Sequence, residues 1–210
     1  MTLVDLTHVI RTGMPVYPGD PTPPRIVRES EHGAGTHQSS ALHTGCHAGT
    51  HIDLPLHFRP GEASLEQWPP ERFTGPAVVV DAPAGEIPAA VVDGVDLGAA
   101  DFLLLRTGWE RHWGTDRYYA GWPYLSEALA DRLAAAGLKG VGLDTPSIDP
   151  VDRDTCHRRL AAAGLVNIEN LARLDRLPAG ETFRLWILPL PLAGAEASPV
   201  RAVAEVAGPC

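Results

Sequence analysis

Short apolar runs rich in valine, leucine and isoleucine recur along the chain, and their length is typical of buried β-strands. We expect strands at residues 3–10, 77–81, 102–106, 141–144 and 183–190. Pro189 and Pro191 lie near the end of the last run. Because proline cannot donate a main-chain hydrogen bond, this end is predicted at an edge or exit of the sheet.

Two segments between these runs have the pattern of amphipathic helices. Residues 126–136 begin with Ser126 as the predicted N-cap, carry leucines on one face and stop before Gly137. Residues 154–163 form the second predicted helix, with Asp154 as its N-cap. Because helices and strands alternate, the predicted fold class is α/β, with mixed α+β layers.

The composition supports one domain rather than two. The chain has 210 residues, of which 44% are hydrophobic, so it can bury a sizeable core. No segment has the composition of a linker, and we find no internal repeat. The 21 glycines and 20 prolines are scattered, which indicates many turns. We therefore expect a single domain over residues 1–210, with central β-structure, short helices and many loops.

The charge pattern excludes several partner classes. There are 17 basic and 26 acidic residues, a net charge of −9 with no basic stripe, so nucleic acid is not an expected partner. No segment has the apolar length of a membrane span, and the first residues lack the features of a signal peptide. The three cysteines are far apart, so we expect no disulfide framework and a cytoplasmic, reduced protein.

Chemistry concentrates in one run, His47-Ala48-Gly49-Thr50-His51-Ile52-Asp53-Leu54-Pro55-Leu56-His57-Phe58. Its three histidines and its aspartate stand at odd-numbered positions, and alternate side chains of an extended segment point the same way. They could therefore converge on a metal ion, with Gly49 leaving room for its approach. The alternative is a set of histidines on a solvated loop.

A second group of candidates follows the strand predicted at 141–144. His157 and Glu169 come after the stretch Gly142-Leu143-Asp144-Thr145-Pro146-Ser147-Ile148-Asp149-Pro150. Glu169 lies between apolar neighbours, where a carboxylate is costly unless it is paired or bound to a metal. The alternatives are a half-exposed Glu169 and a surface His157.

Two further histidines and the three cysteines are not expected to bind the metal. His37 and His43 belong to a stretch rich in glycine, serine and threonine, residues 33–49, which is predicted as a loop leading to the site. They are expected to be solvated. The alternative is that they contact a metal ligand or the substrate. Cys46 and Cys156 each precede a candidate histidine and are expected to be packing residues, with soft metal ligation as the alternative. Cys210 is expected in an exposed tail.

These motifs resemble the metal-dependent cyclase family, which includes bacterial kynurenine formamidase and isatin hydrolase. The resemblance rests on the His47–Phe58 run, the 142–150 stretch, His157 with Glu169-Asn170-Leu171, and the ending Ser198-Pro199-Val200-Arg201-Ala202. The stretch Tyr17-Pro18-Gly19-Asp20 also matches, and the motifs occur in the family's order along nearly the whole chain. The implied fold is the kynurenine formamidase-like swivelling β/β/α fold.

The resemblance implies a centre of two divalent metal ions, with zinc expected first and manganese as the alternative. The implied ligands are His47 and His51 on the first ion, Asp53 bridging both, His157 on the second, and Glu169 on one or both. His57 would be the catalytic acid/base rather than a ligand. Tyr17 aligns with a substrate-contacting aromatic residue that is typically tryptophan in the formamidases. A homodimer or homotetramer is implied as well.

The expected function is hydrolysis of a small-molecule amide, by metal-activated water with a histidine acid/base. An aryl formamide such as N-formylkynurenine is the first expected substrate. Two alternatives use the same centre: opening of a cyclic amide such as isatin or a lactam, and ring closure in aromatic polyketide synthesis. A third alternative is a binding or structural protein that a metal stabilises, in which the coordination shell would be closed.

Overall fold

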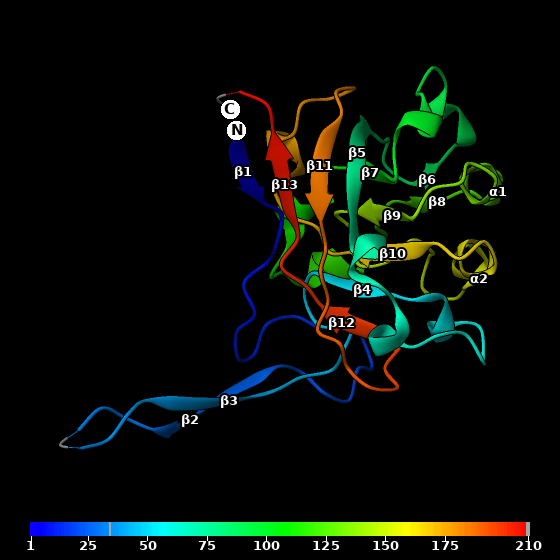
Figure 1. Ribbon diagram of the computed structural model, residues 1–210. Coiled ribbons are helices and arrows are strands. Elements are labelled where there is room, and N and C mark those ends of the chain that lie inside the picture. The colour runs from blue at the N-terminus through cyan, green and yellow to red at the C-terminus, as the bar shows by residue number, and fades with distance from the viewer. Residues whose placement is uncertain (34, 209–210) are drawn as a thin grey trace.

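The computed structural model describes residues 1–33 and 35–208, so Cys210 lies outside the described part. A nine-stranded sheet forms its centre (Figure 1). In spatial order its strands are β1 (Thr2–Asp5), β13 (Val203–Val206), β11 (Phe183–Trp186), β5 (Thr74–Asp81), β7 (Phe102–Arg106), β9 (Gly140–Leu143), β10 (Val166–Glu169), β4 (His51–Asp53) and β12 (Ala197–Pro199). Two small sheets pair β2 (Arg25–Ser30) with β3 (Ser39–His43), and β6 (Glu86–Ile87) with β8 (Tyr124–Leu125).

The described residues contain two α-helices, α1 (Glu127–Ala134) and α2 (Thr155–Ala162). Short 3-10 helices occupy Pro55–His57, Leu65–Gln67, Pro70–Phe73, Ala89–Val92, Leu97–Ala99, Trp109–His112, Asp116–Tyr119 and Leu174–Arg176. None of the described helices is long and apolar enough to cross a membrane. The mixed α/β class predicted from the sequence is confirmed.

The middle of the sheet is parallel and its two ends are antiparallel. Strands β5, β7, β9 and β10 run parallel to one another, and α1 and α2 lie in the connections that join β7 to β9 and β9 to β10. Both helices lie on the same side of the sheet, while β4 and β12 run across the direction of β11 and β5 (Figure 1). The curled sheet thus has a helix-covered face and an inner face.

Each face has its own core, because strand side chains alternate between faces. Leu103 and Leu105 of β7 join the core that contains α1 and α2, whereas Phe102 and Leu104 join the core inside the curl. Gly142 of β9 permits this close packing. A Cβ atom there would lie 2.7 Å from a methyl carbon of Leu104, which is too close for any side chain.

Several predicted elements are confirmed. The strand at 102–106 has the predicted bounds, the strand at 77–81 begins earlier, at Thr74, and the strand at 141–144 is shifted by one residue. Helix α1 begins after Ser126, whose hydroxyl accepts a hydrogen bond from Leu129 N at 3.1 Å. The predicted N-cap is therefore confirmed.

Two strand predictions were too long. The strand at 3–10 ends at Asp5, after which Thr7 forms a bridge with Leu171 near the other end of the sheet. The strand at 183–190 ends at Trp186, and Pro189 then forms an isolated bridge with Val200. Apolar runs report burial, which continues after the chain leaves its strand, so they overestimate strand length.

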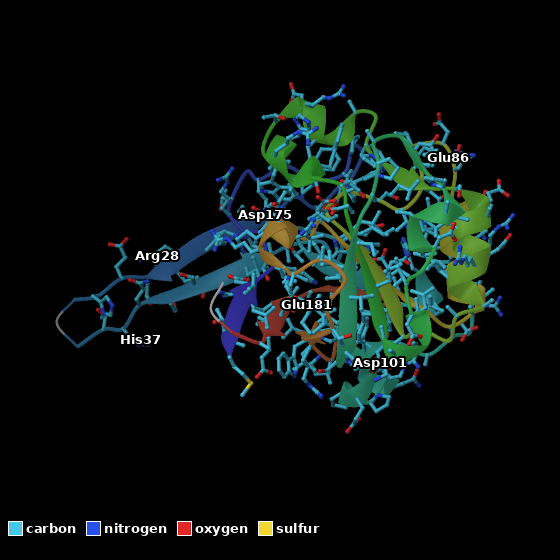
Figure 2. All side chains as sticks on the ribbon, turned by 90° about the horizontal axis from the view of Figure 1, so that it is seen from above. Arg28, His37, Glu86, Asp101, Asp175 and Glu181 are labelled. Atoms are coloured by element: carbon cyan, nitrogen blue, oxygen red, sulfur yellow. The ribbon has the colours of Figure 1, made fainter. Side chains whose placement is uncertain are left out.

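The loop predicted at 33–49 is wrong for residues 39–43, which form strand β3. Strands β2 and β3 form a hairpin arm that projects from the body of the molecule (Figures 1 and 2). His37 and His43 lie on this arm with exposed side chains, and the groups of candidate metal ligands found in the described residues include neither. Residues 44–49 alone connect the arm to the site.

Candidate metal centre

The run from His47 to His57 is not one extended segment, contrary to the geometric argument from its spacing. Residues 47–50 form a turn, His51–Asp53 is strand β4, and Pro55–His57 is a 3-10 helix. Gly49 adopts a φ of +68°, and a Cβ atom there would lie 3.2 Å from the Met14 methyl group. Gly49 therefore serves the turn and its packing, rather than the approach of an ion.

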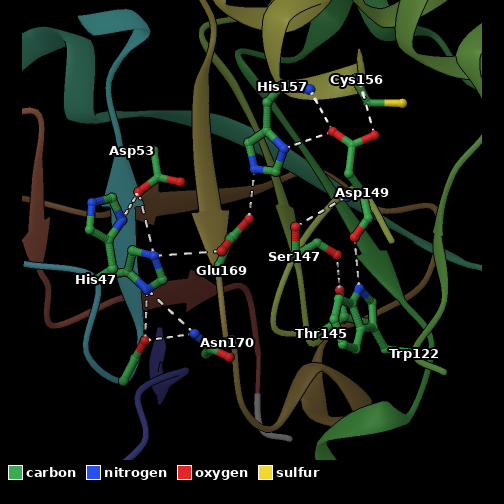
Figure 3. A network of polar contacts seen from close by, with 12 residues as sticks. His47, Asp53, Trp122, Thr145, Ser147, Asp149, Cys156, His157, Glu169 and Asn170 are labelled. Atoms are coloured by element: carbon green, nitrogen blue, oxygen red, sulfur yellow. Dashed lines mark hydrogen bonds and ion pairs between the residues drawn. The ribbon is translucent and has the colours of Figure 1, made fainter. Parts of the chain in front are cut away.

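Strand β4 places two candidates side by side because it pairs with β10 on one edge and with β12 on the other. In register, His51 stands opposite Glu169 of β10 and Pro199 of β12. The side chain of Ile52 joins the core inside the curl, so His51 and Asp53 project to the opposite side. Helix α2 contributes His157 from its first turn (Figure 3).

The five residues predicted as ligands come together in two groups that share Asp53. One group is His47, His51 and Asp53; the other is Asp53, His157 and Glu169. His47 Nδ1 lies 2.8 Å from Asp53 Oδ1, and His157 Nε2 lies 3.2 Å from Glu169 Oε1. Three imidazoles and two carboxylates of this kind suit zinc, manganese or iron.

One buried atom indicates that a cation belongs at this centre. His51 Nε2 makes no hydrogen bond within the described part of the chain, although it lies 3.4 Å from Asp53 Oδ1 and 3.6 Å from Glu169 Oε2. Buried polar atoms without partners are rare because they cost free energy. A divalent cation between these atoms would satisfy all three, so the residues fit a metal ion.

The electrostatics agree with this fit. Burial alone would lower the pKa of His157, but Asp149 and Glu169 outweigh it and raise the pKa to about 10. Burial likewise opposes the effect of Asp53 and Glu196 on His47, and the two carboxylates raise its pKa to about 9. Cations are strongly favoured among these acidic groups, whether they are protons or metal ions.

Each of the three histidines has an acceptor behind it. His157 Nδ1 donates to Asp149 Oδ2 at 2.7 Å, His51 Nδ1 lies 2.8 Å from Gly49 O, and His47 Nε2 lies 3.0 Å from Glu196 Oε1. An acceptor on the far nitrogen fixes the tautomer and orientation of a metal-binding imidazole. Neither Asp149 nor Glu196 was predicted as a site residue from the sequence.

The second helix begins where it was predicted, but Asp149 rather than Asp154 supplies the capping bonds. Asp154 occupies the N-cap position, but its side chain makes no capping bond and pairs with Arg158 instead. The N–H groups of Cys156 and His157 donate to Asp149 at 3.1 and 2.9 Å. One carboxylate thus caps α2 and holds its histidine, and the Asp149-Pro150 pair in the motif was the available signal.

Asn170 joins the turn before β4 to the end of β10. It has a φ of 57°, which is unusual for a residue other than glycine. Its side-chain amide donates to Gly49 O at 2.9 Å, and its oxygen accepts from the Tyr118 hydroxyl at 2.8 Å. The hydroxyl of Thr50 donates to the main-chain oxygen of Asn170 at 2.6 Å. The backbone around His51 is therefore held by several buried bonds.

His57 lies in the wall of the site but belongs to neither of the two ligand groups that share Asp53. Its ring centroid is 4.4 Å from that of His47, and its side chain is exposed. Desolvation by surrounding atoms lowers its pKa, although neighbouring Asp53 acts in the opposite direction. The 3-10 helix that begins at Pro55 brings it there, since it turns the chain back after β4.

A cavity of about 510 Å³ opens in front of these residues. Tyr17, Phe58 and Tyr119 line it, and Tyr17 meets Tyr119 edge to face with centroids 6.1 Å apart. Neither Phe58 nor Tyr119 was singled out by the sequence analysis. Arg153 and Asp154 also border the cavity. The walls suit a flat, partly apolar molecule of small size.

The two described cysteines take no part in the candidate ligand groups. Cys156 belongs to α2 and is buried in the core on the helix-covered face, and its thiol donates to Leu125 O at 3.4 Å. Cys46 is half-buried and pairs with no other described cysteine. Cys156 thus occupies a packing position, as the sequence suggested.

Comparison with known proteins identifies the family. The model of the Cyclase family matches residues 4–150. The chain is 36% identical to a kynurenine formamidase of Paracidovorax citrulli (96% of this chain and 95% of the relative) and 34% identical to one of Salinibacter ruber (97% of each).

Solved structures agree with these relatives. Isatin hydrolase A of Labrenzia aggregata has a TM-score of 0.84 at 25% identity, covering 97% of this chain and 93% of that one. A Bacillus stearothermophilus protein named as a predicted metal-dependent hydrolase has a TM-score of 0.80 at 30% identity, covering 97% of each chain. This chain belongs to the cyclase family and is a metal-dependent hydrolase, as the resemblance of its motifs implied.

Proposed function

We propose that this member of the cyclase family hydrolyses the amide bond of a small aromatic substrate, first of all an aryl formamide such as N-formylkynurenine. The observation that carries the proposal is the pair of ligand groups sharing Asp53, with a separate histidine beside them at a cavity. The kynurenine formamidase relatives, among them one at 36% identity, support the same substrate class.

We infer that two divalent ions bind here, zinc in preference to manganese. The proposed ligands are His47 and His51 for one ion, His157 for the other, Asp53 for both, and Glu169 for one or both. Bound divalent ions would supply a polarised carbonyl oxygen and a water whose pKa approaches neutrality. Five ligands leave positions open for water and substrate, unlike the closed shell of a structural zinc site.

His57 is the proposed acid/base. It takes the proton of the attacking water and returns it to the amide nitrogen as the C–N bond breaks, which releases formate and the arylamine. Its place beside His47 at the wall of the cavity supports this role. Because it lies outside the five proposed ligands, its imidazole remains free for proton transfer.

Tyr17, Phe58 and Tyr119 are proposed to hold the aromatic ring of the substrate. Phe58 itself packs against His157, with ring centroids 4.6 Å apart, so a ring bound against it lies next to the metal ligands. A cyclic amide would fit the same walls, and the isatin hydrolase structures favour it as the second candidate.

The hairpin arm leads us to propose a homo-oligomer, most simply a homodimer. Ile26 and Leu42 stand opposite each other on its strands, and their side chains are exposed. A two-stranded hairpin is only marginally stable alone in water, so a second copy is expected to cover it. Light scattering after gel filtration tests this prediction.

A cytoplasmic location is proposed as well, because neither described cysteine is paired.

A substrate panel tests the proposed reaction. Metal-loaded protein should release formate from N-formylkynurenine with a kcat/KM above about 10⁴ M⁻¹s⁻¹, the lower end of the usual enzyme range. Ring opening of isatin and of a simple lactam should be measured in parallel. Faster turnover of isatin would select the second candidate, and no turnover of any amide would contradict the proposal.

A further inference from the structure

Glu196 is an acidic residue whose main chain is fixed next to the centre. It immediately precedes β12, and its carbonyl oxygen accepts a hydrogen bond from Leu54 N at 2.8 Å. The following residue, Ala197, stands opposite Asp53 in the pairing of β12 with β4. The pairing of these two strands therefore determines where the Glu196 side chain begins.

That side chain contacts His47 from the side opposite Asp53. Glu196 Oε1 lies 3.0 Å from His47 Nε2, while Asp53 Oδ1 lies 2.8 Å from His47 Nδ1. A neutral imidazole has one N–H and one lone pair. A carboxylate on Nε2 holds the proton there and directs the Nδ1 lone pair towards Asp53, where an ion would accept it.

The three proposed histidine ligands share this arrangement but differ in what supports it. The acceptor of His51 is a main-chain oxygen, and Asp149, the acceptor of His157, is buried and receives two further N–H groups. The Glu196 side chain is 35% exposed, and His47 is 29% exposed. His47 thus has the least constrained ring of the three and depends most on a single contact.

We propose that Glu196 is a positioning residue that orients His47 for metal binding and keeps its ring from turning towards His57. This inference rests on the proposed function, because it assumes that His47 binds an ion. Glu196, His47 and His57 also offer donor atoms within 4.8 Å of one another, so a direct ligand role for Glu196 is the competing outcome.

The experiment measures Zn²⁺ affinity and stoichiometry by chelator competition, together with Co²⁺ absorption spectra. In E196A one of the two ions should bind about 10–100-fold more weakly, the usual cost of losing such an acceptor. E196Q should recover most of this loss, since an amide oxygen accepts the same hydrogen bond. At saturating Zn²⁺, the kcat of E196A should return towards the wild-type value.

Two control variants separate the outcomes. Glu62 pairs with Arg59 on the surface, so E62A should bind both ions normally. H57A should also bind both ions normally, and a loss there matching that of E196A would assign Glu196 as a ligand and overturn the inference. Normal binding by E196A would overturn it too, with the proposed function intact. A wild-type protein that binds no divalent ion would contradict the proposed function and this inference together.

Discussion

The two halves of the proposed metal centre differ in exposure and support. On the inner half, the side chains of His157 and Asp149 are 7% and 3% exposed. On the outer half, His47 and Glu196 are 29% and 35% exposed, and the His57 side chain is exposed too. The comparison teaches that the inner half is built as part of the core, whereas the outer half remains open to substrate and water.

The difference follows from the elements that carry each half. His157 and Glu169 come from the start of α2 and the end of β10, both of which pack into the cores. His47 lies in a turn and His57 in a 3-10 helix, which have fewer main-chain bonds. We therefore expect inner changes to reduce folding stability and outer changes to alter metal exchange and catalysis.

Removal of metal should have the largest effect, because it abolishes the chemistry of both halves. We expect a chelator to reduce hydrolysis to background while far-ultraviolet circular dichroism is retained, since the apolar side chains of both cores include none of the proposed ligands. Stability should fall by about 3 kcal/mol for each ion formerly present at 100 times its Kd. Unfolding at the same chelator concentration as inactivation would instead indicate a structural metal.

Replacement of Asp149 is the strongest test of the inner half. D149A leaves the start of α2 uncapped and His157 without its partner, so we expect a loss of about 3–5 kcal/mol in the free energy of unfolding. Urea denaturation measures the change. D154A is the control, because Asp154 meets Arg158 at the surface, and it should reduce the stability far less than D149A does. Equal effects of the two variants would contradict the proposed contrast.

Asn170 separates lost hydrogen bonds from backbone strain at the same position. N170A removes the bonds to Tyr118 and Gly49 and places alanine at a φ of 57°. N170G removes the same bonds but tolerates that φ. We expect N170A to cost about 3 kcal/mol and N170G about 1 kcal/mol less, in urea denaturation. A larger loss for N170G would show that the backbone shape at this residue matters little.

Tyr17 should show the smallest effect, and it should be confined to substrate binding. Loss of its ring in Y17A should raise KM about fivefold, because an aromatic contact contributes about 1 kcal/mol, with little change in kcat. Y17F keeps the ring and should stay within about twofold of wild type. A loss of kcat in Y17F would show that the Tyr17 hydroxyl takes part in the reaction, which contradicts a role confined to substrate binding.

Much of the fold could be predicted because the central strands are apolar on both faces. The run at 102–106 is buried throughout, which made its bounds visible. Other strands are harder to predict from the sequence. Burial alternates along β13, and β4 has only three residues. The order of the strands depends on long-range pairing that no local pattern records.

The proposed ligands could be named because four of the six predicted site residues with metal or acid/base roles fall in one short run. Their roles as ligands remain predictions, although the structure brings them together. Asp149 stood in a recognised motif without an assigned role. Glu196 could not be found, because only the pairing of β12 with β4 brings it to His47. A lone acidic residue in a turn usually indicates a solvated surface.

The most direct test of the central claim is the metal content and turnover of H57A, measured on one preparation. The account predicts two equivalents of divalent ion per chain, as in wild type, with kcat for formamide hydrolysis reduced by about 10²–10⁴-fold, the usual contribution of an acid/base. Retained activity at full metal content would contradict the role of His57. Loss of an ion would show that His57 is itself a ligand.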